Sequence, residues 1–121
     1  MNSRIPLLLA LGAIALTAAL APIALAHKTP RARAAASVSV SGKEFSFALS
    51  SKSAKAGTIT FRFTNKGKLG HDFKIDGKRT PVIKPGRSAS ITVRLKKGTY
   101  SYLCTVKGHA ASGMKGRFKV R

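Results

Sequence analysis

The sequence predicts a small β-sandwich behind an apolar leader, and three observations support this fold class. After Ala26 the chain contains short runs in which apolar and polar residues alternate, a period of two that is typical of strands with one buried face. Residues that favour turns separate these runs. No segment after Ala26 has the spacing of apolar residues that a helix requires. With 121 residues, the chain has room for one such domain.

The leader is the first element of the chain. One cation, Arg4, precedes an almost wholly apolar stretch over residues 5–26, which ends in the small-x-small sequence Ala24-Leu25-Ala26. This pattern predicts a secretory signal peptide over residues 1–26, cut after Ala26. The alternative is an uncleaved membrane anchor, since the stretch is long enough to span a bilayer. We therefore expect an exported protein, periplasmic or extracellular, with membrane anchoring as the alternative.

Residues 27–36 follow as a basic linker without apolar periodicity. Cleavage after Ala26 would make His27 the N-terminal residue, whose amine and imidazole can bind a metal ion when a second histidine lies nearby. The other two histidines, His71 and His109, belong to a different pattern, so we interpret His27 as a solvated linker residue. The folded domain is expected over residues 37–121, about 85 residues, which is close to the size where one core is only marginally sufficient.

The domain consists of strand-like runs separated by turn residues. Seven or eight short strands at this spacing are typical of a β-sandwich. The runs lie at residues 38–40, 45–49, 59–63, 71–75, 91–95, 100–104 and 118–120, and the turns at 41–42, 56–57, 65–67, 76–77, 84–86 and 97–98.

The net charge of the chain is extreme for its size. It is formally +20, and loss of residues 1–26 would leave +19, with 22 cations against 3 acidic residues. Such a charge predicts attraction to a partner protein with an acidic docking surface and to an anionic membrane or cell-wall surface. Nucleic acid would bind non-specifically in vitro, but the predicted export argues against such a function. We expect the protein to be a monomer.

The only cysteine of the chain is Cys104. Small exported domains usually pair their cysteines in disulfides, so a single thiol in an oxidising compartment needs another occupation. Metal ligation is one such occupation, and a buried inert thiol is the alternative.

Cys104 begins a pattern of ligand-type residues, C-x4-H-x4-M, that continues through His109 to Met114. Upstream, His71 stands at the start of a predicted strand. Two imidazoles, one thiolate and a weak axial thioether are the donors of a mononuclear blue-copper site. The sequence therefore predicts one copper ion per chain, with these four residues as candidate ligands. Gly108 and Gly113 each precede a candidate ligand and allow tight turns there.

These motifs resemble the cupredoxin family, the group of plastocyanin, azurin and auracyanin. The segment Gly-Thr-Tyr-Ser-Tyr-Leu-Cys at 98–104 resembles the strand that leads to the cysteine ligand, and Gly70-His71-Asp72 resembles the Gly-His-Asn motif of the first histidine ligand. The loop length is similar to that of auracyanin and rusticyanin. The resemblance covers residues 37–121 and implies a Greek-key β-sandwich, with copper held by His71, Cys104, His109 and, axially, Met114.

One departure from the family pattern concerns Asp72, where asparagine is common. Asp72 is expected to face Thr105 and to accept a hydrogen bond from its amide or hydroxyl. A charged carboxylate there would favour Cu(II) and lower the reduction potential.

The resemblance implies a mobile one-electron carrier, with His109 as the point where electrons enter and leave. A protein that buffers or delivers copper would use the same ligands but exchange the metal readily. A metal-free immunoglobulin-like binding module is the third alternative, although the chain has no second cysteine and no tryptophan. We do not expect an enzyme, because three acidic residues offer no paired carboxylates for acid–base chemistry.

Overall fold

The computed structural model describes residues 10, 12–26 and 35–121 of a chain that divides into two units, Met1–Arg31 and Ala32–Arg121. Residues 12–26 contain neither helix nor strand. In the described part of the chain, no helix is long and apolar enough to cross a membrane. The start of the predicted signal peptide, His27 and most of the predicted linker lie outside the described residues, so the expectations about them stay predictions.

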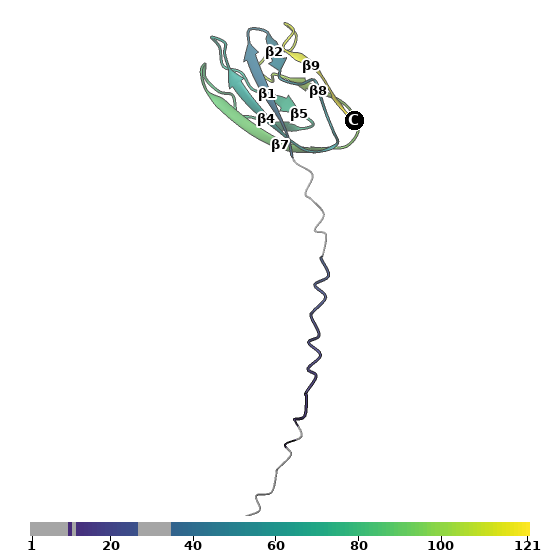
Figure 1. Ribbon diagram of the computed structural model, residues 1–121. Coiled ribbons are helices and arrows are strands. Elements are labelled where there is room, and N and C mark those ends of the chain that lie inside the picture. The colour runs from purple at the N-terminus through teal and green to yellow at the C-terminus, as the bar shows by residue number, and fades with distance from the viewer. Residues whose placement is uncertain (1–9, 11, 27–34) are drawn as a thin grey trace, which may run out of the picture. The chain divides into compact units, whose positions relative to one another are not determined.

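The second unit is a sandwich of two β-sheets (Figure 1). The first sheet has the strand order β2-β1-β4-β7 and the second has the order β3-β9-β8-β5-β6. Neighbouring strands are antiparallel except for the parallel pairs β1–β4 and β3–β9. This architecture confirms the predicted all-β sandwich. The strands are β1 (Ala36–Lys43), β2 (Ser46–Leu49), β3 (Ser53–Ala54), β4 (Gly57–Asn65), β5 (Lys74–Ile75), β6 (Lys78–Arg79), β7 (Ser88–Leu95), β8 (Gly98–Leu103) and β9 (Lys115–Val120).

The described residues form nine strands rather than the seven or eight expected. The additional strands, β3 and β6, have two residues each, too few to produce an alternating pattern in the sequence. β6 pairs with β5 across a two-residue turn in which Asp76 and Gly77 both have positive φ, 48° and 75°. An Asp-Gly pair favours such a turn, because both residues tolerate that backbone conformation.

The turn predicted at Ser41-Gly42 is wrong, because β1 continues through both residues to Lys43. Gly42 is needed inside the strand for a different reason. A Cβ atom at this position would lie 2.6 Å from the Phe63 ring and 3.0 Å from the methyl carbon of Met114. The glycine therefore makes room for two neighbouring core side chains rather than turning the chain.

The core between the sheets is centred on Phe73, which is fully buried. Its ring centroid lies 5.4 Å from those of Phe47 and Phe61 and 5.5 Å from that of Tyr102. Aromatic pairs at such distances add to the stability gained by burying their area. Phe73 follows His71 by two residues, so this packing fixes the backbone that carries one of the candidate ligands.

Candidate metal centre

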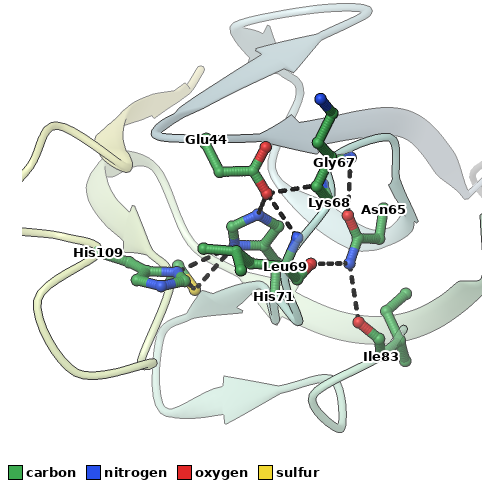
Figure 2. A network of polar contacts seen from close by, with 9 residues as sticks. Glu44, Asn65, Gly67, Lys68, Leu69, His71, Ile83 and His109 are labelled. Atoms are coloured by element: carbon green, nitrogen blue, oxygen red, sulfur yellow. Dashed lines mark hydrogen bonds and ion pairs between the residues drawn. The ribbon is translucent and has the colours of Figure 1, made fainter. Parts of the chain in front are cut away.

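His71 lies between β4 and β5, on a segment held by backbone and side-chain hydrogen bonds. Its amide donates to the Ile83 carbonyl at 3.2 Å, and the Ile83 amide donates to the His71 carbonyl at 2.8 Å. The Asn65 side-chain amide donates to the carbonyls of Leu69 and Ile83, both at 2.8 Å (Figure 2). His71 is completely buried, so these contacts set the position of its ring from within the core.

The other three candidate ligands lie on the loop from β8 to β9. The Cys104 amide donates to the Met114 carbonyl at 3.1 Å, and the Met114 amide donates to the His109 carbonyl at 3.1 Å. Gly108 and Gly113 have φ of 81° and 114°, as their predicted role in tight turns requires. The first of these backbone hydrogen bonds brings Cys104 close to Met114, ten residues later in the chain. The second holds His109 close to Met114.

The structure brings His71, Cys104 and His109 into one cluster. The Nδ1 atoms of the two histidines are 3.0 Å apart, and the Cys104 sulfur lies 3.9 Å from His71 Nδ1 and 3.6 Å from His109 Nδ1. Their ligand atoms all lie within 4.8 Å of one another, and the three residues are buried. Two nitrogens and one sulfur therefore face a common point.

These distances fit a metal ion bound by all three groups. Metal–nitrogen bonds near 2.0 Å and metal–sulfur bonds near 2.3 Å place neighbouring donors roughly 3 to 4 Å apart. The donor set, two imidazoles with a thiolate, is the set that copper prefers in trigonal sites with a weak axial thioether. The residues are thus arranged as a type 1 copper site and fit one copper ion per chain.

Met114 lies beside this cluster. It is fully buried, its backbone bonds to both Cys104 and His109, and its methyl group packs against β1 at Gly42. Its main chain is thus joined to both ligands of the same loop, which is compatible with the predicted role of Met114 as the axial donor.

Glu44, which the sequence analysis did not single out, contacts the first histidine directly. Its Oε1 atom accepts from His71 Nε2 at 2.9 Å and from the amides of Lys68 and Leu69 at 2.8 and 2.7 Å (Figure 2). Because a carboxylate can only accept, the His71 proton is on Nε2, and Nδ1 is left with a lone pair toward Cys104 and His109.

The same contacts hold the Glu44 carboxylate in its charged form. Hydrogen bonds from the Leu69 amide foremost, and also from the His71 ring and the Lys68 amide, lower its pKa from 4.5 to about 2. Gly67 allows this approach, since a Cβ there would lie 2.5 Å from Glu44 Oε1 and 2.9 Å from His71 Nε2. The only sequence signal was that Glu44 is one of three acidic residues in a very basic chain.

Asp72 accepts hydrogen bonds from Thr105, as predicted. The Thr105 amide donates to Asp72 Oδ1 at 2.6 Å, and the Thr105 hydroxyl donates to Oδ2. Both carboxylate oxygens act as acceptors, and Asp72 is fully buried. The bond joins the segments that carry His71 and Cys104.

The thiol of Cys104 is buried, and burial raises its pKa above the usual value. The free thiol is therefore protonated at neutral pH, and a metal that binds the thiolate displaces that proton.

The rim of the centre is apolar. Phe45 is 37% exposed and its ring centroid lies 5.1 Å from that of His109, which is itself 8% exposed. Leu69, which is 49% exposed, lies two residues before His71. Val82, which is 57% exposed, precedes Ile83, the residue that pairs with the His71 backbone. In residues 35–121 these three are the exposed large apolar side chains, and all of them come from segments around the centre.

Comparison with known proteins places this centre in a family. A model of the cupredoxin-like domain matches residues 12–116. Rusticyanin of Acidithiobacillus ferrooxidans is 35% identical over 83 residues, which cover 52% of this chain and 53% of the relative. The chain thus spans about half the length of the curated relatives it matches.

Solved structures share the fold of the sandwich. Auracyanin from Roseiflexus castenholzii superimposes with a TM-score of 0.64 at 23% identity, over 72% of this chain and 98% of that one. Auracyanin B gives a TM-score of 0.64 at 25% identity, over 72% and 89% of the two chains. With the matching family model, the shared sandwich and the clustered donors, the chain belongs to the cupredoxin family.

Proposed function

We propose that this protein is a one-electron carrier that binds copper through His71, Cys104, His109 and, axially, Met114. The observation that carries the proposal is the buried cluster of two imidazole nitrogens and one thiol sulfur within 4.8 Å. Copper bound there would supply the Cu(I)/Cu(II) couple. Soft sulfur donors suit Cu(I) and imidazoles suit Cu(II), so one set of ligands serves both oxidation states.

The protein's own residues keep the site the same in both states. Glu44 fixes the tautomer of His71, and the Asp72–Thr105 bond ties the His71 segment to the residue after Cys104. Core packing of Phe73 prevents movement of the same segment. A site that does not rearrange has a small reorganisation energy and therefore transfers electrons quickly.

His109 is the proposed point of electron exchange with a partner. It is the candidate ligand beside the exposed ring of Phe45, at the apolar rim of the centre. The 23 cations of the chain would attract a partner with an acidic docking surface, and salt would slow this association strongly.

The proposed place of work is outside the cytoplasm, with the apolar segment 5–26 as a signal peptide cut after Ala26. The proposed protein is a monomeric carrier and not an enzyme, and it is attracted to anionic membrane or cell-wall surfaces. Mass spectrometry of the exported protein tests cleavage directly, and a mature chain that begins at His27 is the expected result.

An optical spectrum after addition of Cu(II) tests the proposed site. We expect an intense thiolate-to-copper band in the visible range, lost in Cys104→Ser and retained in Ser112→Ala, an exposed neighbour on the same loop. Absence of the band in the unmodified chain would refute the copper assignment.

Dialysis separates the carrier from a copper-delivery protein. A carrier keeps its copper through dialysis against buffer without chelator and cycles between oxidised and reduced spectra. Rapid loss of copper, with a strong preference for Cu(I), would instead support delivery or buffering.

A further inference from the structure

The outward faces of the two sheets carry different numbers of cations. On the first sheet, hydroxyl side chains face solvent in cross-strand pairs, such as Thr60 with Thr92 at 3.0 Å and Thr64 with Ser88 at 2.8 Å. The cations on that face are three, Lys43, Arg62 and Arg94.

The second sheet concentrates cations on its outward face. On β9, Lys115, Arg117 and Lys119 alternate with inward residues and are exposed. The register places Arg117 opposite Ser101, and Lys119 opposite Thr99, on β8. Lys115 pairs with Leu103 of β8, and Leu103 pairs on its other side with Lys74 of β5. Lys74 in turn pairs with Arg79 of β6. These five cations, Lys74, Arg79, Lys115, Arg117 and Lys119, define the cationic face.

No acidic side chain lies on the cationic face. Glu44 and Asp72 are engaged at the metal centre, and the exposed Asp76 lies in the turn that ends the β5–β6 hairpin. A surface pocket on this face is lined by Ser101, Tyr102 and Leu103 of β8 and by Lys115, Gly116 and Arg117 of β9. Hydroxyl and cationic donors around a hollow are the groups that bind phosphate oxygens.

We propose that the cationic face is a docking surface for an anionic phospholipid membrane. The charge of the face is complementary to an array of phosphate headgroups, and a five-stranded sheet presents it as a broad surface. A protein partner would be expected to need apolar anchors at the centre of its interface. The exposed large apolar residues of the described sandwich, Phe45, Leu69 and Val82, lie instead at the metal centre.

This arrangement gives the molecule two separate working surfaces. Cys104 follows the end of β8 and Met114 precedes β9, so the metal centre lies at one end of these strands, whereas the cationic face is their broad side. A membrane bound to the face leaves the apolar rim free for a redox partner. The inference rests on the proposed location outside the cytoplasm, but not on copper binding.

Two triple variants with the same change of charge test the proposal. The face variant carries Arg79→Gln, Arg117→Gln and Lys119→Gln. The control carries Lys43→Gln, Arg62→Gln and Arg94→Gln on the outward face of the first sheet. Each removes two arginines and one lysine, all exposed. The full chain is used throughout, so that its apolar N-terminal segment contributes equally to every measurement.

Flotation with vesicles of phosphatidylcholine, with and without phosphatidylglycerol, measures binding. Each cation close to an anionic membrane contributes roughly a factor of five to its affinity, so the face variant should bind the anionic vesicles about a hundredfold more weakly. Packed sheets lie about 10 Å apart, a distance similar to the Debye length at physiological salt. Because salt screens charges on the far sheet from the membrane, the affinity of the control for anionic vesicles should fall by less than about threefold.

Three outcomes would overturn the proposal. The first is an equal loss of affinity for anionic vesicles in both variants. The second is equal binding of the unmodified chain to neutral and anionic vesicles. The third is weaker binding of the face variant to polyglutamate together with unchanged binding to vesicles. The visible copper band of each protein is recorded in parallel. A missing band with selective vesicle binding contradicts only the proposed function, and a normal band with equal weakening contradicts only the docking surface.

Discussion

Glu44 joins two segments of the centre through a single carboxylate oxygen. That oxygen accepts from the His71 ring and from two backbone amides of the preceding loop. A ligand histidine that is held in this way keeps its tautomer and ring orientation without help from the metal. The residue thus prepares the site before copper arrives.

Glu44→Gln is expected to weaken copper binding by about 10- to 100-fold, the usual cost of losing a carboxylate behind a metal-bound histidine. Competition with a Cu(I) chelator measures the affinity. Asp76→Asn removes the same charge from an exposed turn and serves as the control. Equal affinities of the Glu44 variant and the unmodified chain would contradict the role given to this contact.

The same residue predicts how the metal-free protein responds to acid. The folded-state pKa of Glu44 is about 2 against 4.5 for the free side chain, so below 4.5 the unfolded chain binds more protons than the folded one. The stabilisation is complete above 4.5 and is lost as the pH falls toward 2. Urea unfolding over this range should show a shallower decline of stability in Glu44→Gln, and parallel curves would refute the assignment.

Asp72→Asn is expected to raise the reduction potential of the copper protein. A carboxylate charge close to the copper favours Cu(II), and asparagine keeps an acceptor for Thr105 without such a charge. For one electron, a tenfold change in relative affinity for the two oxidation states is about 59 mV, so a rise on the order of tens of millivolts is expected. Voltammetry provides the measurement, and an unchanged or lowered potential would exclude this effect.

At the scale of elements, β1 and the first sheet close the centre from one side. Gly42 of β1 faces Phe63 and Met114 so closely that a methyl group there would overlap with the Phe63 ring and press against the Met114 methyl group. The candidate axial ligand, Met114, therefore packs against β1 at Gly42.

Gly42→Ala is expected to destabilise the fold by about 1–3 kcal/mol, the typical cost of overpacking a filled core. Denaturant unfolding of the metal-free protein measures this change. Ser37→Ala, at an exposed position of the same strand, is the matched control and should change stability by less than about 0.5 kcal/mol. Similar stabilities of the two variants would show that the core around Gly42 accommodates a methyl group without loss of stability.

The sequence was sufficient to predict the longer strands and the candidate ligands. The alternation in β4 and β7 survives because one face of each strand packs on the core, and the ligands stand out because cysteine, histidine and methionine are rare in this chain. The two-residue strands β3 and β6 were missed, since their pairing depends on neighbours brought close by the fold.

Contacts across the fold explain the other differences. Phe45 alternates with Phe47 and so appeared to belong to the same strand, but it lies before β2 and packs on His109. The contact between Glu44 and His71 spans 27 positions and depends on where β1 ends. Such contacts leave no local pattern in a sequence, because they arise only when distant segments meet.

For the whole molecule, a small core makes the bound metal important for stability. The described sandwich has fewer than ninety residues, a size at which hydrophobic burial alone leaves little margin. A ligand that binds only the folded state adds its binding free energy to the stability.

Copper is therefore expected to stabilise the folded protein by about 2.7 kcal/mol when its free concentration is a hundred times the dissociation constant. Thermal unfolding with and without Cu(I) under reducing conditions measures this increase. Cys104→Ser should show a much smaller shift. An equal shift in both proteins would mean that the metal acts elsewhere on the chain.

The loop between β8 and β9 has a further consequence for how such a molecule tolerates change. Leu103 and Lys115 pair in the strand ladder, and the Cys104 amide bonds to the Met114 carbonyl just beyond them. The two ends of the loop are thus fastened to each other, whatever residues lie between. Insertions or deletions between these ends would change the surroundings of His109 but leave Cys104 in place. The loop can therefore vary in length and sequence without disturbing the sheet that carries it.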